Sequence, residues 1–172
     1  MKKLNRKQFL TASSLGLGSL ILPPKSFGRS LQQDTPNPIK PEIVKEFVGA
    51  SHGKFDRSKE LMEEYPNLLY SSWDWGNGDF ETGFEAAGHV GNKTIANYMI
   101  EKGARLNIFV MTMLGKTNIV KSVLEEYPHL LNSTGAHGFT LLHHAKKGGD
   151  DALELFEYFQ EKGLKDMKVN IK

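Results

Sequence analysis

The 172-residue chain contains no cysteine, and this absence removes several classes of function at once. Without cysteine the chain can form no disulfide, offer no thiolate nucleophile and carry no lipid on a thiol. The absence is compatible with an oxidising compartment as well as with a reducing one. Cysteine usage therefore excludes thiol chemistry but does not decide where the protein is located.

Long hydrophobic runs and an excess of positive charge are also missing. No apolar stretch is long enough to cross a membrane, and the composition is ordinary for a soluble globular protein with one modest core. The formal charge is +2, but residues 1–28 hold five basic and no acidic side chains. The remainder holds 17 basic and 20 acidic side chains, a net formal charge of −3. Because it lacks the cations that neutralise phosphates, we expect no nucleic-acid binding.

The first 28 residues have the pattern of an export signal peptide. Basic residues come first, an apolar stretch rich in Leu, Gly, Ser and Ala covers 9–22, and small residues follow near Gly28. The segment N-R-K-Q-F-L is similar to the twin-arginine pattern, with Lys7 in place of the second arginine. The alternative, a short helix of the folded domain, conflicts with the poor helix propensity of the Gly/Ser-rich run. We expect an exported protein, periplasmic or secreted, with a proline-containing linker at 29–41.

The rest of the chain is repetitive. Residues 47–71 align without a gap to residues 109–133, with 12 identities in 25 positions, at an offset of 62. Two segments of a second kind, around Thr82 and Thr140, alternate with these copies. Apolar residues at helical spacing predict helices in each unit. In the helix after Lys116 the predicted buried stripe is Ile119, Val120, Val123, Leu124 and Tyr127.

The segment 138–149, which reads G-F-T-L-L-H-H-A-K-K-G-G, resembles the T-P-L-H-x-A signature of the ankyrin-repeat family. The residues in register are Thr140, Leu142, His143 and Ala145. Leu141 stands where the family has proline, and Gly149 falls at the turn between the two helices of a unit. The resemblance implies an all-α ankyrin-repeat solenoid of about four helix pairs over 42–164, with a C-terminal tail at 165–172. The third unit is too short to carry a hairpin finger, so we expect one finger to be missing.

The resemblance implies a mode of action but no chemical reaction. Proteins of this family grip other proteins with their loops and first helices, so we expect a non-enzymatic interaction module with a protein partner and no cofactor. Two long connectors, 69–82 and 131–140, enter alternate units and should project from the same edge with a gap between them. Their aromatic and polar side chains match interface hot spots, with Trp73 or Trp75 as the anchor. The predicted partner-binding residues are Trp73, Asp74, Trp75, Asn77, Asp79, Phe80, His137 and Phe139. We expect one of these two tryptophan rings to pack inward and the other to face outward.

The alternative function is a metal-dependent hydrolase that uses the region of His137, His143 and Asp150. Adjacent histidines such as His143 and His144 point about 100° apart on a helix, so the two cannot face one ion. Zinc motifs on helices use spacings of three or four residues instead. We therefore expect no catalytic residue and no metal ligand. A third possibility, a domain that serves only as an assembly spacer, and the oligomeric state both remain open.

Overall fold

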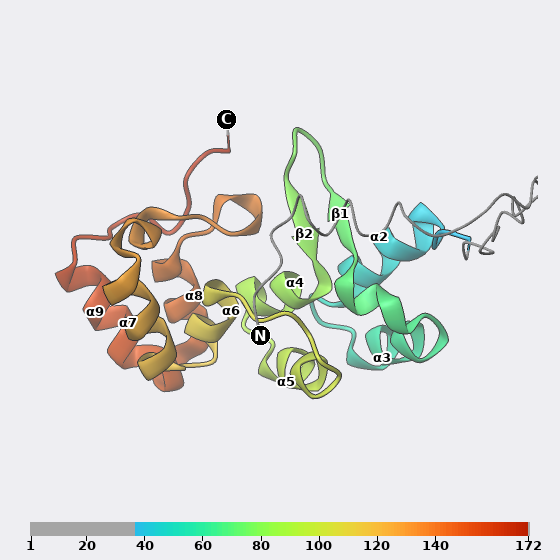
Figure 1. The fold of residues 1–172 in the computed structure, drawn as a ribbon, viewed down its shortest axis with the longest axis horizontal. Helices are drawn as coiled ribbons and strands as arrows, with labels where there is room; N and C mark the ends of the chain where they lie inside the picture. Colours follow the sequence, from blue (N-terminus) through green and yellow to red (C-terminus); the bar gives the residue numbers. More distant parts are fainter. Residues whose placement is uncertain (1–36, 172) are drawn as a thin grey trace, which may run out of the picture. The chain divides into compact units, whose positions relative to one another are not determined.

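The computed structural model describes residues 37–171. The predicted export signal and most of the predicted linker lie outside these residues. The described part is mostly helical, as the sequence predicts, and its elements follow one another as a row of helix pairs (Figure 1). Within this part of the chain, none of the helices combines the length and the apolar character needed to cross a bilayer.

Each pair consists of a first and a second helix. The first helices are α2 (Pro41–Ala50), α4 (Gly83–Val90), α6 (Ile108–Met113) and α8 (Leu141–Gly148). The second helices are α3 (Phe55–Glu64), α5 (Lys93–Glu101), α7 (Thr117–Glu126) and α9 (Leu153–Glu161). The first helices contact one another in series, α2 with α4, α4 with α6 and α6 with α8, and each contacts its own second helix. This arrangement buries apolar stripes that a single pair would leave in water.

The duplicated segments adopt the same local structure. Each second helix ends at a Tyr-Pro sequence and leads into a 3-10 helix, η1 (Pro66–Tyr70) in one copy and η2 (Pro128–Asn132) in the other. Tyr65 has φ −128° and ψ 79°, and Tyr127 has φ −126° and ψ 71°. The serine after each 3-10 helix donates its hydroxyl to the carbonyl three residues earlier. The sequence duplication is therefore a structural duplication as well.

The units of the second kind also match each other at their start. Thr82 caps α4 and Thr140 caps α8, and each side chain accepts a hydrogen bond from the backbone N–H three residues later. Gly91 ends α4 in the left-handed conformation, with φ 86°. A Cβ at Gly91 would lie 2.7 Å from the carbonyl oxygen of Lys147, so glycine is required there for packing as well as for backbone conformation.

The core runs along the row of helices. Its largest fully buried apolar side chains are Phe47, Leu61, Leu68, Ile95, Met99, Met113, Leu141, Leu142, Leu155 and Phe159. The stripe predicted for α7 is correct only in part. Val120 and Leu124 are buried, whereas Ile119 and Tyr127 are about half-exposed. The reason is that α7 packs mainly on α6 and η2, so part of its surface stays in solvent.

The connector after η1 forms a β-hairpin that rises above the helices (Figure 1). Strands β1 (Ser72–Asp74) and β2 (Phe80–Thr82) pair in antiparallel fashion, with Trp73 opposite Glu81. The turn contains three consecutive residues with positive φ, from Gly76 to Gly78. The described part is thus all-α apart from this short hairpin, where aromatic and Thr residues favour extended backbone.

The remaining connections differ from one another. The third pair starts without a hairpin, as expected, and Asn107 caps α6 by accepting a hydrogen bond from the N–H of Val110. The C-terminal tail lies along the second long connector and belongs to the fold. The N–H of Thr140 donates to the carbonyl of Met167, and the N–H of Val169 donates to the carbonyl of Gly138. The folded domain therefore extends past residue 164, where the sequence analysis ended it.

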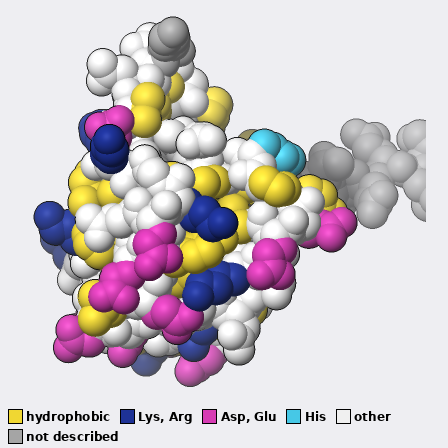
Figure 2. Space-filling view, turned by 90° about the vertical axis from the view of Figure 1, so that its left-hand side faces the viewer, with side chains coloured by type: hydrophobic (Ala, Val, Ile, Leu, Met, Phe, Trp, Pro, Cys, Tyr) yellow, Lys and Arg dark blue, Asp and Glu magenta, His cyan; other side chains and the backbone are white. Residues whose placement is uncertain are grey.

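The α7 and α9 end of the described domain carries charges of both signs (Figure 2). Lys121 of α7 and Glu154 of α9 form an ion pair of 2.7 Å across the two helices. Hydrophobic side chains lie among the charges on this face (Figure 2), and Leu153 at the start of α9 is about half-exposed. A nucleic-acid interface gathers cations on one face, and this face instead mixes the two signs.

Candidate functional site

The two long connectors meet at one edge of the domain. Asp79, at the end of the hairpin turn, accepts a hydrogen bond of 2.8 Å from the backbone N–H of His137. The second carboxylate oxygen lies 2.6 Å from Nδ1 of the same histidine. The connectors share an edge, as the sequence analysis expects, but this contact bridges the gap that was expected between them. Asp79 and His137 are therefore engaged with each other inside the chain.

The backbone of His137 is unusual, because its φ of 59° lies in the left-handed region. A non-glycine residue pays about 1–2 kcal/mol for that conformation. The two hydrogen bonds to Asp79 hold the residue in place and offset this cost. Strain of this kind persists where the surroundings determine the geometry, which makes this edge a candidate functional site.

The two tryptophans of the hairpin face different surroundings, as expected, although residues two apart in a strand lie on the same face. Trp73 is half-buried against the core, with the ammonium of Lys45 5.5 Å from its ring. Trp75 is 40% exposed. Its Nε1–H nevertheless donates a hydrogen bond of 2.8 Å to Oε2 of Glu81. Trp73 therefore anchors the hairpin to the helices. Trp75 binds the buried carboxylate of Glu81, and part of its ring stays exposed to solvent.

The other predicted partner-binding residues divide into outward and inward groups. Phe80 is 59% exposed, and Asn77 lies in the exposed turn with φ 57°. Asp74 folds back on the hairpin, where its side chain accepts a hydrogen bond from the next-but-one backbone N–H. Phe139 is half-buried and stacks on His143, with ring centroids 3.9 Å apart. Phe80, Asn77 and the exposed Asp74 can touch a partner without rearrangement, whereas Phe139 is held in its stack on His143.

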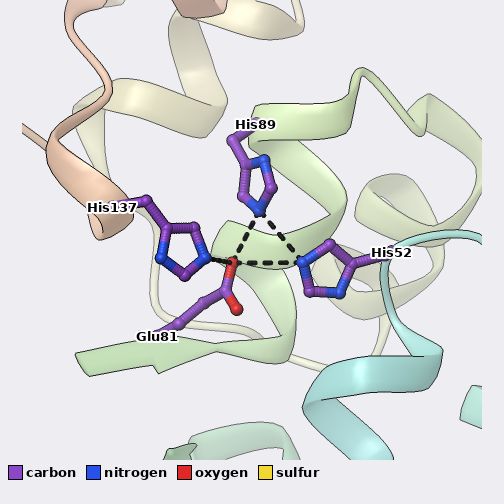
Figure 3. A group of neighbouring side chains, drawn as sticks. All are labelled: His52, Glu81, His89 and His137. Carbon is purple, nitrogen blue, oxygen red and sulfur yellow. Dashed lines mark hydrogen bonds and ion pairs between the residues drawn. The ribbon is translucent and has the colours of Figure 1, made fainter. Parts of the chain in front are cut away.

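Four titratable side chains converge where the hairpin meets the helices (Figure 3). They are His52 in the turn after α2, Glu81 on β2, His89 in α4 and His137 in η3 (Ala136–Gly138). One nitrogen or oxygen atom of each residue lies within 4.8 Å of those of the others. Three units of the repeat row thus contribute to one cluster of ligand-type side chains.

Oε1 of Glu81 lies close to the Nε2 atoms of all three histidines of this cluster. The Nε2 atom of His89 is 2.7 Å away, that of His137 is 3.3 Å away and that of His52 is 3.6 Å away. The Nε2 atoms of His52 and His89 are 3.1 Å apart. Glu81 is fully buried, and its Oε1 accepts no well-aligned hydrogen bond despite the short contact with His89. The cluster therefore holds a buried carboxylate oxygen that lacks a proper partner.

The outer nitrogen of two of the imidazoles is engaged by the protein. Nδ1 of His52 faces backbone carbonyl oxygens at the end of α2, at 3.1 and 3.2 Å. Nδ1 of His137 faces the carboxylate of Asp79. Because a carbonyl or carboxylate oxygen only accepts hydrogen bonds, Nδ1 must carry the proton in both rings. In the neutral rings, both Nε2 atoms therefore direct a lone pair toward Glu81.

Both carboxylates at this edge favour the ionised form. Burial raises the pKa of Glu81, but the contact with His89 and the neighbouring His52 outweigh burial and hold the pKa below its usual value. Burial likewise raises the pKa of Asp79, but its backbone and side-chain hydrogen bonds with His137 bring the pKa below the usual value. A buried negative charge requires a positive partner nearby. Histidine protons or a metal cation are the two ways to provide one here.

The three residues of the hydrolase alternative do not come together. Among the described residues, the one group with ligand-type geometry contains His137 but neither His143 nor Asp150. Nε2 of His143 lies 2.8 Å from the backbone oxygen of His89, and burial lowers the pKa of His143. Asp150 is exposed in η4 (Gly149–Ala152). A hydrolase site built on those three residues has no geometric basis in this arrangement.

His144 is a core residue, although it is adjacent to His143 in sequence. Its side chain is almost fully buried, its Nδ1–H donates to the carbonyl oxygen of Thr140, and its ring lies beside Phe109. Burial lowers the pKa of His144 to about 4. The two neighbouring rings thus have different surroundings, as expected for successive positions of a helix.

No pattern in the sequence predicts His52, Glu81 or His89 as site residues. Their spacing in the sequence, 29 and 8 residues, matches no short metal-binding motif. A difference between the aligned repeat copies is the one feature of the sequence that could have indicated His52. His52 aligns with Leu114 of the second copy, and polar residues that replace apolar ones in an aligned repeat indicate a role outside common packing.

Comparisons with known proteins add little to this description. No family model matches the chain, and no solved structure matches it. The chain is similar to alpha-latrocrustotoxin-Lt1a from Latrodectus tredecimguttatus, with 34% identity over 82 residues. The match covers 42% of this chain and 6% of the toxin. The chain thus spans a small fraction of that protein's length, and the function must be inferred from the site itself.

Proposed function

We propose that this chain is an exported repeat protein of the ankyrin type whose folded domain acts as a non-enzymatic protein-interaction module. The observation that carries the proposal is the row of helix pairs in which two kinds of unit alternate and matching units share their caps and turns. Solenoids built in this way present extended surfaces on which partners bind. Export rests on the signal-like pattern of residues 1–28, by either the twin-arginine or the general secretory route.

The hairpin edge is the surface that we assign to the partner. Phe80 and Trp75 are the exposed aromatic side chains of the hairpin, and Tyr70 at its base is about half-exposed. Aromatic side chains on a projecting element supply large contact area and dominate many interfaces. Because Trp73 is committed to the core, the anchor of the interface is Trp75 or Phe80.

Affinity capture with the full chain, followed by titration of the recovered partner, tests this proposal. Phe80→Ala removes an exposed ring and should cost about 2 kcal/mol of binding, or about 30-fold in Kd, with an unchanged melting temperature. Tyr127→Ala is the matched control, because Tyr127 is a comparably exposed aromatic residue on a second helix of the row. If Phe80→Ala binds the partner as tightly as wild type and Tyr127→Ala binds it more weakly, the interface lies on the second helices and the proposal is wrong.

A further inference from the structure

We propose that His52, Glu81, His89 and His137 bind one Zn²⁺ ion through three imidazole Nε2 atoms and Oε1 of the carboxylate. The site replaces the expectation from the sequence that the chain has no metal ligand. It goes beyond the interaction role proposed above and does not depend on it.

The first argument is the spacing of the four donor atoms. A tetrahedral zinc ion with bonds of about 2.0–2.1 Å places its donors about 3.3 Å apart. Four of the separations in the cluster are 2.7, 3.1, 3.3 and 3.6 Å, and all four donor atoms lie within 4.8 Å of one another. These values lie on both sides of the ideal separation, so small side-chain adjustments make room for the ion.

The second argument is the chemistry of the inward-facing atoms. Nε2 of His52 and Nε2 of His137 present lone pairs, because the protons of both rings are held at Nδ1. They converge on Oε1 of Glu81, a buried oxygen without a well-aligned hydrogen bond. Converging lone pairs repel one another, and the buried Oε1 of Glu81 is left as an unsatisfied polar atom. One cation at the centre serves all of them at once.

The third argument is the outer ring of hydrogen bonds. Metal-binding histidines usually donate their other N–H to a carboxylate or a backbone carbonyl, which fixes the ring and its tautomer. His137 has the carboxylate of Asp79 in that position, and His52 has backbone carbonyls. Trp75 holds the second oxygen of Glu81 in the same way. Three of the four ligands are thus oriented by contacts behind them.

The donor set selects the metal. Three imidazoles and one carboxylate suit zinc and its neighbours among the transition metals, whereas Ca²⁺ and Mg²⁺ prefer shells of oxygen ligands. With no cysteine in the chain, no thiolate competes for the ion. Four protein ligands fill a tetrahedral shell, which is the arrangement of structural zinc sites. The side chain of His52 is 31% exposed and gives the ion access from solvent.

A structural ion at this position would fasten the two connectors to the helices. Glu81 comes from the hairpin and His137 from the second connector, whereas His52 and His89 come from the first two helix pairs. The ion would thus cross-link segments separated by up to 85 residues. The hairpin edge would then keep one conformation because of the metal, in addition to its own hydrogen bonds.

Metal titration of the full chain tests the site. Protein purified without a polyhistidine tag and stripped with a chelator is titrated with Zn²⁺ by calorimetry and with Co²⁺ by visible absorption. We expect one ion per chain, a Kd for zinc of about 0.1 μM or lower, and the intense absorption of tetrahedral Co²⁺. Glu81→Gln keeps the size of the side chain and removes its charge, and should weaken zinc binding by at least about 100-fold. His129→Asn is the matched control, because His129 is an exposed histidine outside the cluster, and it should bind zinc as wild type does.

Three results would overturn the site. They are the absence of stoichiometric zinc binding by the folded chain, the weak absorption of six-coordinate Co²⁺, and an equal loss of affinity in Glu81→Gln and His129→Asn. If circular dichroism shows that Glu81→Gln is unfolded, His52→Asn decides the question, because His52 lies at the partly exposed rim. A folded His52→Asn that binds zinc as tightly as wild type contradicts the proposal, and a loss of about 100-fold supports it.

Discussion

The two long connectors occupy equivalent places in the repeat row but have become different structures. Each leads into a threonine N-cap, Thr82 in one unit and Thr140 in the other. One position before the cap, the first connector has the buried carboxylate of Glu81, whereas the second has Phe139, which stacks on His143. The first forms a hairpin of two strands, whereas the second closes on itself through a single bridge and also pairs with the C-terminal tail.

This difference shows that packing constrains the sequences of the helices more strongly than those of the connectors. The helices of both copies bury similar stripes and keep the same caps and turns, because each helix must cover its neighbours. A connector has only to join two helices, so its sequence can change without loss of the core. Each connector contributes one residue to the cluster, Glu81 from the first and His137 from the second. The experiments below test this division, starting with the largest expected effect.

The largest effect is expected in the helices. Phe47 and Phe109 occupy aligned positions of the two copies, but Phe47 is fully buried and Phe109 only half-buried. Phe47→Ala should lower the free energy of unfolding by about 3–5 kcal/mol, and Phe109→Ala should cost less, because less apolar surface is lost. Chemical denaturation of both variants provides the comparison. Equal losses would mean that the two copies contribute equally to the core.

The second effect is a loss of stability in acid that depends on His144. Its pKa is about 4 in the folded chain and about 6.5 when exposed, so the unfolded chain binds the extra proton between these values. The contribution of His144 to the free energy of unfolding is therefore fully present above about pH 6.5. It is lost as the pH falls toward 4, by about 3 kcal/mol in total. Denaturation at several pH values, in chelator, should show a weaker pH dependence in His144→Gln than in wild type. The same slope in both proteins would contradict a buried, neutral His144.

The third effect distinguishes two aromatic residues of the hairpin. Trp75→Phe keeps most of the ring surface but leaves Oε2 of the buried Glu81 without its donor, which should cost about 1–3 kcal/mol. Phe80→Ala, which removes a more exposed ring, should change stability by less than about 0.5 kcal/mol. Thermal melts of the two variants measure the difference. A greater loss in Phe80→Ala would show that Phe80 packs inward in solution.

The smallest effect concerns the tail. Deletion of residues 166–172 removes the hydrogen bonds of Thr140 to the carbonyls of Met167 and Asp166, and that of Val169 to Gly138. At about 0.5–1.5 kcal/mol for each bond, less the entropy of ordering the tail, the net loss should be about 1–2 kcal/mol. Hydrogen exchange should become faster in the second connector and stay unchanged in the hairpin. Faster exchange in both connectors would show that they form one cooperative unit.

The repeat architecture could be predicted from the sequence because its determinants are local. The copies of 47–71 and 109–133, the threonine caps and the glycine at the end of α4 all act within a few residues of their own position. The different exposure of Trp73 and Trp75 does not follow from the period of an extended strand, because residues two apart lie on the same face. The exposure of Ile119 and Tyr127 could not be predicted, because it depends on which elements pack against α7.

The cluster could not be predicted from spacing. Its ligands come from a turn, a strand, a helix and a 3-10 segment, and only the stacking of units brings them together. His137 was identified for its place in a connector, and His143 for its place in the repeat signature. The structure joins His137 to Glu81 and assigns His143 to the packing beneath Phe139. Which of the two histidines joins the cluster depends on the tertiary arrangement, and a sequence pattern does not contain that information.

The most direct measurement is anomalous diffraction at the zinc absorption edge from crystals of the chain grown with Zn²⁺. The account predicts a single strong peak among the side chains of His52, Glu81, His89 and His137, about 2.0–2.2 Å from three Nε2 atoms and Oε1 of the carboxylate. A peak at His129 or His143 instead, or no peak within the cluster, would contradict the central claim that the connector edge is organised around a metal ion.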